Sequence, residues 1–162
     1  MSPTELLAGG YRMGRQLVHA LTADLTDDEF RYQPVPGANC AAWVVGHLAV
    51  TARRTAHRLG AADLPELTEE FIALYSQTKK PAGVQTELSA KADLLKLFDV
   101  CVEQLMDAVR AIPFESLDAP PAGVGPFATN FAEAVLFGAM HVTFHCGQLS
   151  TIRRSLGKPP ML

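Results

Sequence analysis

Apolar residues recur with the period of an α-helix in four long segments of this 162-residue chain, and no segment alternates convincingly with the period of a β-strand. The segments cover residues 3–23, 39–59, 86–112 and 130–156. Amphipathic stretches of this length, joined by loops, are typical of a helical bundle. The sequence therefore predicts an all-α fold, a four-helix bundle, in which residues 1–162 form a single domain.

Residue types at the ends of the segments support these bounds. Ser2, Asn39 and Asn130 are predicted to cap the first, second and fourth helices, because their side chains can accept a hydrogen bond from a free backbone N–H. Glu133 lies at the third helical position of the fourth segment, where it would complete a capping box with Asn130. Gly60 is predicted to end the second helix.

The connections and glycines add detail to this prediction. Residues 25–39 contain two prolines and a glycine and are predicted to form a loop, whereas residues 62–78 could form a short extra helix between the second and third long helices. Gly9, Gly10 and Gly14 each weaken the first helix by about 1 kcal/mol relative to alanine. We therefore expect these glycines to permit a close helix contact.

The composition excludes several functional classes. With 48% apolar and 19% charged residues the chain is globular, and a net charge of −3 without a long Lys/Arg cluster argues against nucleic-acid binding. No run of about 18 apolar residues predicts a membrane span, and the N-terminal stretch lacks the pattern of a signal peptide. The three cysteines show no CxxC pattern and suit a reducing compartment. We expect a cytoplasmic protein that binds neither nucleic acid nor membrane.

Three histidines are the candidate functional residues. His141 and His145 lie four residues apart, which places both on one helical face, roughly 6 Å apart along the axis. That face is mostly apolar and should point into the bundle, as should the face that carries His47. The three imidazoles could be core residues that each bond a carbonyl or hydroxyl group, or they could share one metal ion. Helical spacing alone leaves both interpretations open.

A site with three histidine ligands would keep coordination positions open, which is the catalytic rather than the structural arrangement for zinc. Cys40 lies two turns before His47, about 10 Å along the helix, and is too far away to be a fourth ligand. Cys146 should point away from the paired histidines and pack in the core. His19 and His57 have no companion at ligand spacing and are predicted to be structural or solvent-facing.

Three further residues lie near the predicted site. Gln148, seven residues after His141, could orient a histidine or a bound water, or it could make a helix-packing hydrogen bond. Arg54, on the face of His47, could hold a substrate carboxylate or be a solvent-facing charge near the helix end. Trp43, one turn before His47, could pack in the core or line a substrate site.

Two stretches resemble a known family. Residues 43–49 (WVVGHLA) and 141–157 (HVTFHCGQLSTIRRSLG) are similar to the DinB-like, or YfiT-like, four-helix bundle proteins. That family pairs a histidine in a W-x-x-x-H-L context with an H-x-x-x-H-x-G-Q phrase on the last helix. The resemblance implies a metal site formed by His47, His141 and His145, with zinc or nickel as the usual ion.

The resemblance also implies a function. Family members of known activity perform metal-dependent transfers or isomerisations with low-molecular-weight thiols such as bacillithiol, mycothiol or glutathione, and members often dimerise. We therefore expect a homodimeric, metal-dependent thiol S-transferase or thiol-dependent isomerase that acts on a small electrophile. The alternative is a non-enzymatic metal-binding bundle with a role in stability, sensing or the stress response.

Overall fold

A computed structural model of the chain describes residues 1–76, 88–120 and 128–161, and within them every regular element is a helix. The elements are α1 (Pro3–Thr22), α2 (Asp27–Phe30), α3 (Ala41–Arg58), α4 (Glu69–Tyr75), α5 (Lys91–Arg110), the 3₁₀ turn η1 (Phe114–Ser116) and α6 (Phe131–Ser155). The all-α bundle is confirmed, and α4 is the short extra helix expected before the third long one. None of the described helices has the length and apolar character needed to cross a membrane.

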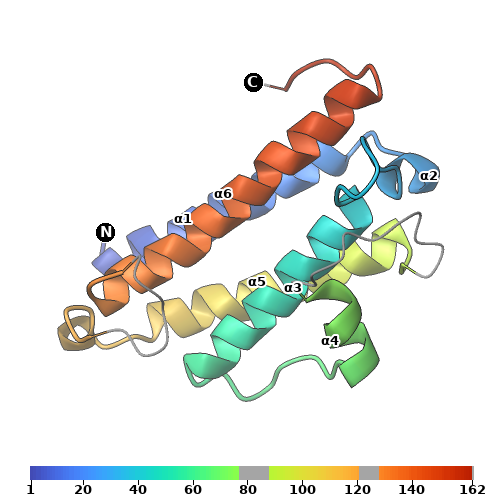
Figure 1. Cartoon of the computed structure of the whole chain (residues 1–162). Helices are drawn as coiled ribbons and strands as arrows, with labels where there is room; N and C mark the ends of the chain where they lie inside the picture. The colour runs from blue at the N-terminus through green and yellow to red at the C-terminus, as the bar shows by residue number, and fades with distance from the viewer. Residues whose placement is uncertain (77–87, 121–127, 162) are drawn as a thin grey trace.

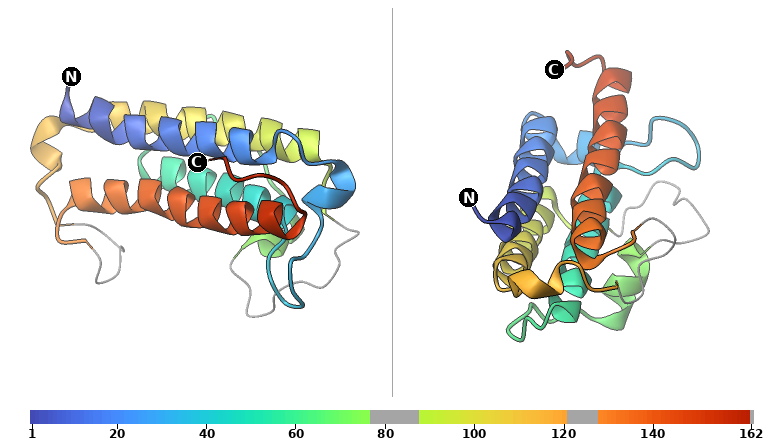
Figure 2. Two further views of the ribbon diagram at one scale, coloured as in Figure 1. Left: turned by 90° about the horizontal axis from the view of Figure 1, so that it is seen from above. Right: turned by 90° about the vertical axis from the view of Figure 1, so that its left-hand side faces the viewer.

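The four long helices form two pairs, as Figures 1 and 2 show. α1 packs beside α6 and the two run in the same direction. α3 packs beside α5, and these two helices are parallel to each other and antiparallel to α1 and α6. α1 also packs on α5, and α3 meets α6. Because α3 and α5 are parallel, the chain must return along the bundle between them. α4 lies in this connection and packs against α3.

Glycine allows α1 and α6 to approach closely, as predicted. A Cβ atom at Gly10 would lie 3.1 Å from a side-chain carbon of α6, and one at Gly14 would lie 2.8 Å from another. At Gly9 only a side chain of α1 itself lies within reach, so the prediction is wrong for that residue. The helix start is confirmed, since the Ser2 hydroxyl accepts a hydrogen bond from the backbone N–H of Glu5 at 3.1 Å.

The predicted start of the second long helix is wrong. α3 follows Cys40, which makes no side-chain cap, and Asn39 instead donates from its amide to Gln148 Oε1 at 3.4 Å. The third long helix begins at Lys91, later than expected, and the predicted start at Thr86 lies outside the described residues. Asn39 therefore connects to α6 through Gln148 and does not cap α3.

The other predicted helix ends are confirmed with one exception. Gly60 follows α3 with a φ angle of 93°, a conformation that glycine adopts without strain. Asn130 caps α6 by accepting a hydrogen bond from the backbone N–H of Glu133 at 2.9 Å. The Glu133 carboxylate accepts from the backbone N–H of Thr129 at 2.7 Å, so it does not complete the capping box.

The stretch 25–39, predicted to be a loop, contains the short helix α2. The Thr26 hydroxyl accepts a hydrogen bond from the backbone N–H of Glu29 at 3.2 Å, and the Glu29 carboxylate accepts from the backbone N–H of Thr26 at 2.8 Å. This reciprocal capping box satisfies two free backbone donors at the helix start and so favours a helix here. The prolines that suggested a loop follow it in the chain, at 34 and 36.

α3 occupies the centre of the bundle. Each of its residues from 41 to 50 is buried, and α5, α4 and α6 all pack on this helix. His47 lies inside this stretch. Burying an imidazole at such a depth costs free energy unless its ring nitrogens find hydrogen-bond or metal partners. The groups around His47 therefore decide its role.

Candidate metal centre

A groove of about 1700 Å³ follows the seam between α3 and α6. Side chains of α3 form one wall, side chains of α6 form the other, and residues of the stretch 34–39 lie along it. The groove exists because α6 packs chiefly on α1 and α3 chiefly on α5, so α3 and α6 meet only locally. All three candidate histidines line it.

The structure brings the three histidines together. Nε2 of His141 lies 3.1 Å from Nε2 of His145 and 3.5 Å from Nε2 of His47. One ligand atom from each residue can be chosen so that all lie within 4.8 Å of one another. His47 and His145 are only 7% and 9% exposed, and His141 is half-buried. Thus one imidazole from α3 and two from α6 converge from opposite walls.

Hydrogen bonds on the far side of two rings fix their tautomers. Nδ1 of His47 lies 2.8 Å from the backbone oxygen of Tyr75, and a carbonyl can only accept, so Nδ1 donates. Nδ1 of His145 donates in the same way to Gln148 Oε1 at 3.1 Å. Each neutral ring then presents an unprotonated Nε2 to the others. These are the outer contacts that commonly orient metal-binding histidines.

The donor set fits a divalent metal ion. A proton on His141 Nε2 could satisfy only one of the two facing lone pairs well, whereas a cation at the centre would satisfy all three. A tetrahedral ion with metal–nitrogen bonds of about 2.0–2.1 Å holds its ligand nitrogens roughly 3.3 Å apart. The separations of 3.1 Å and 3.5 Å are close to this value. No fourth protein ligand joins the group among the described residues.

The groove also favours the neutral imidazoles that a metal requires. Burial lowers the pKa of His145 from 6.5 to about 4, and electrostatic repulsion from His141 and His47 adds to this shift. Burial also lowers the pKa of His47. The hydrogen bond to the Tyr75 carbonyl opposes this shift, and the positive charge of Arg54 adds to it. Burial, His47 and Arg54 together lower the pKa of His141. All three rings are therefore neutral near pH 7.

Trp43 supports the triad from within α3. Its ring stacks on the His47 ring with 4.7 Å between centroids and 10° between planes, and its Nε1 donates to the backbone oxygen of Leu74 at 3.1 Å. Trp43 is buried and lines the groove. Of the two expected roles, core packing fits better, and the residue that it packs against is a candidate metal ligand.

Two residues that contribute to this arrangement went unpredicted. The carbonyl oxygen that accepts from His47 belongs to Tyr75, the last residue of α4. The Tyr75 ring lies on Gly46, where a Cβ atom would come within 2.2 Å of it, so only glycine allows this contact. A glycine in the middle of a helix, directly before a candidate ligand, was the available signal. The backbone oxygen that accepts from His47, by contrast, could not be predicted, because every residue type has one.

The remaining candidates separate into two groups. Gln148 is exposed, but its oxygen accepts from His145, which supports the orienting role over simple packing. Arg54 is exposed and lines the same groove as the triad, where its positive charge adds to the lowering of the pKa of His47 and His141. His57 is exposed and takes no part, and His19 pairs with Asp99 at 2.7 Å between α1 and α5.

The cysteines lie outside the group of candidate ligands, as predicted. Cys40 and Cys146 are buried, and the described residues that could hold a metal together do not include them. Burial raises the pKa of the Cys146 thiol from 9.0 to about 11 and also raises that of Cys40. These thiols are therefore protonated and poor ligands at neutral pH.

Comparisons with known proteins agree with the fold. The chain resembles the crystal structure of a conserved protein from Enterococcus faecalis with a TM-score of 0.72 and 18% identity, over 98% of this chain and 99% of that one. At this identity the likeness shows a shared fold only. No curated protein matches the chain. The family model for the DinB superfamily matches residues 11–149, most of the sequence, so the chain belongs to the DinB superfamily.

Proposed function

We propose that this protein binds one divalent ion, zinc or nickel, through His47, His141 and His145, and that it is a thiol S-transferase or thiol-dependent isomerase acting on a small electrophile. The observation that carries the proposal is the convergence of three neutral imidazoles on an open groove. Membership of the DinB superfamily supports it further.

The chain's own residues bind and orient rather than transfer protons. Tyr75 and Gln148 hold two of the imidazole rings in place, and Trp43 covers one face of His47 and keeps water from it. No carboxylate or lysine occurs among the described residues that line the groove, so the chain offers no obvious general base beside the triad. A bound divalent ion supplies the missing chemistry, because it lowers the pKa of a thiol and stabilises the reactive thiolate.

The form of the site favours a reactive role over a structural one. Structural zinc sites are normally closed by four protein ligands, whereas this group has three, and it faces a groove large enough for small molecules. The bundle also has a large apolar core to which all four long helices contribute. A purely stabilising ion would need neither the opening nor the volume.

The direct test is turnover of a generic electrophile, such as monobromobimane, with several biological thiols. Zinc-loaded and nickel-loaded protein should accelerate conjugation of at least one thiol, and metal-stripped protein should not. His141→Ala should abolish the acceleration, while His57→Ala, an exposed histidine of α3, should keep it. Metal-loaded protein that accelerates no thiol would favour the non-enzymatic alternative.

A further inference from the structure

The charge of the groove differs from that of the whole chain. The chain has 17 acidic and 14 basic residues and a net charge of −3. Yet the charged residues among the described residues that line the groove are two arginines, with neither aspartate nor glutamate, while the three histidines there are neutral. A divalent ion on the triad would make this region more positive still. A large groove of this charge is suited to an anionic ligand.

The two groove arginines, Arg54 and Arg58, have no anionic partner among the described residues. Neither forms an ion pair or a side-chain hydrogen bond within the described part of the chain. Arg15 and Arg110, by contrast, pair with Glu103 at 2.6 Å and with Glu5 at 3.0 Å. Two exposed arginines outside the groove, Arg12 and Arg154, are also unpaired among the described residues, but neither lies beside the triad. The arginines beside the triad are therefore free to bind something that the chain does not supply.

Helix stability explains one of these arginines but not the other. Arg58 lies in the last turn of α3, where a positive charge interacts favourably with the helix dipole. Arg54 lies one turn earlier and gains little from that effect. It is two turns beyond His47, about 10 Å along the axis, and its charge is felt by both His47 and His141. A small molecule can therefore reach Arg54 and the triad together.

The opposite wall defines the rest of the ligand. Phe131, Ala134 and Val135 of α6 line the groove and are apolar. Tyr11 also faces it, but its hydroxyl already donates to the backbone oxygen of Val135 at 2.9 Å. That wall accepts an apolar body and offers few polar contacts. Recognition of charge is thus left to the α3 side.

We infer that the groove selects a small organic anion, whose carboxylate is bound by Arg54 with help from Arg58 while its other end reaches the histidine triad. The planar guanidinium of arginine matches a carboxylate with two parallel hydrogen bonds, which favours this anion over others. The inference rests on the proposed function for the use of the groove, and it adds the chemical class of the substrate. The carboxylate could belong to the thiol or to the electrophile.

Trp43 provides a readout that does not require turnover. It is the single tryptophan of the chain and it lines the groove beside His47, so its fluorescence reports on ligands bound there. Zinc-loaded protein is titrated with 3-mercaptopropionate and with its neutral amide. Metal-free protein is titrated with 3-phenylpropionate and with its neutral amide. The first pair tests a carboxylate on the thiol, and the second a carboxylate on a thiol-free molecule.

In at least one pair the anion should bind about tenfold more tightly than the amide, and added salt should reduce that preference. Arg54→Met should remove the preference, Arg54→Lys should restore part of it, and Arg58→Met should weaken it about threefold. Arg154→Met is the matched control, because Arg154 is an exposed arginine of α6 outside the groove.

The outcomes separate this inference from the proposed function. Equal affinity for the charged and neutral members of both pairs, no measurable binding, or a preference that survives Arg54→Met would overturn the inference. Zinc affinity is measured on the same proteins. It should not fall in Arg54→Met, since removal of a nearby positive charge can only favour a cation. If the wild-type protein binds no zinc, the proposed metal site is wrong. Titration of the metal-free protein with 3-phenylpropionate and its amide would still test the role of Arg54.

Discussion

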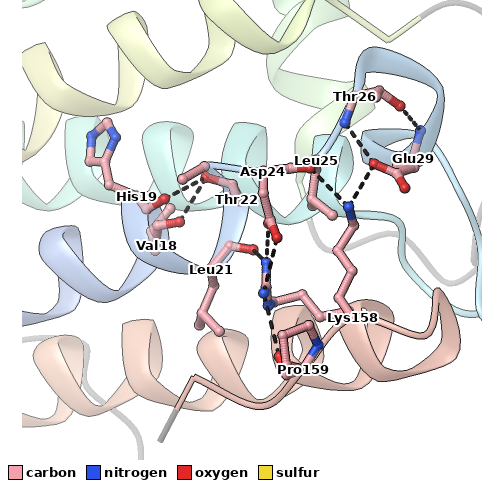
Figure 3. Close-up of polar contacts among 12 residues, drawn as sticks. Val18, His19, Leu21, Thr22, Asp24, Leu25, Thr26, Glu29, Lys158 and Pro159 are labelled. Carbon is pink, nitrogen blue, oxygen red and sulfur yellow. Dashed lines mark hydrogen bonds and ion pairs between the residues drawn. The ribbon is translucent and has the colours of Figure 1, made fainter.

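Two polar regions of this protein use the same residue types in opposite ways. At the corner where α6 ends beside the start of α2, Arg153 is only 4% exposed and is surrounded by its own partners. Its guanidinium donates to the carboxylate of Asp24 and to the backbone oxygens of Leu21 at 3.2 Å and Pro159 at 3.4 Å. Figure 3 shows this corner, in which Lys158 also bonds the backbone oxygen of Asp24 at 2.9 Å.

In the groove, by contrast, the arginines have no such partners in the part of the chain that the structure describes. Arg54 and Arg58 meet no carboxylate among the described residues, and the Nε2 atoms of the triad face one another. At the corner both terminal nitrogens of Arg153 are paired within the chain, although its Nε has no hydrogen-bond partner, and these contacts hold the C-terminal residues against α1 and α2. In the groove the polar groups remain available to a ligand. The difference indicates which arginines stabilise the fold and which serve binding.

The largest expected effect concerns the triad. His145→Ala removes the most buried of the two α6 imidazoles and should weaken zinc or nickel binding at least about 100-fold, equal to about 2.7 kcal/mol. His57→Ala should leave the affinity unchanged. Calorimetric titration of both variants checks this. Equal losses in the two variants would contradict the assignment of the ligands.

The corner should respond in the opposite way. Arg153→Met leaves Asp24 without its partner and should lower the free energy of unfolding by about 2 kcal/mol, less than a fully buried ion pair because Asp24 is half-exposed. Metal affinity should not change. Urea unfolding of Arg153→Met and Arg154→Met provides the comparison, and a similar loss in both would remove the distinction between paired and free arginines.

A glycine pair tests how the fold supports the triad. Gly46→Ala forces a methyl group into the Tyr75 ring, so it should lower the free energy of unfolding by roughly 1–2 kcal/mol. It should also reduce metal affinity about tenfold, because it shifts the carbonyl that orients His47. Gly147→Ala has open space around it and should stabilise α6 by up to about 1 kcal/mol. Unchanged metal binding in Gly46→Ala would show that the Tyr75 contact is dispensable.

Much of this could be predicted from local patterns, and the rest depended on distant contacts. Periodicity located the four long helices, and the spacing of His141 and His145 with a family phrase indicated the triad. The pairing of Arg153 with Asp24 joins residues 129 positions apart, which no local pattern reveals. The Tyr75 carbonyl is backbone, so its role carries no residue signature. The groove depends on how far α3 and α6 separate, which is set by tertiary packing.

The smallest effect is a difference in acid response between the two regions. In metal-free protein the unfolded chain protonates its histidines near pH 6.5, whereas folded His145 resists protonation until about pH 4. Stability should therefore fall as the pH drops from 6.5 toward 4, by on the order of 1 kcal/mol down to pH 5.

The corner should respond only at lower pH. Arg153 lowers the pKa of Asp24, so the stability that this carboxylate contributes is present above about pH 4 and is lost below it. Urea midpoints from pH 7 to pH 3 should show a weaker upper step in His145→Gln and a weaker lower step in Arg153→Met. A single shared step, altered equally by both variants, would contradict the separation of the two regions.

The most direct test of the central claim is the metal content of untagged protein after stripping and reloading with zinc. The structure predicts one ion per chain, accompanied by a change in Trp43 fluorescence and lost when His47 and His145 are both replaced by alanine. If the protein binds no stoichiometric ion, or if the double variant binds it as well as the wild type, the convergence of the three imidazoles is packing and the metal site does not exist.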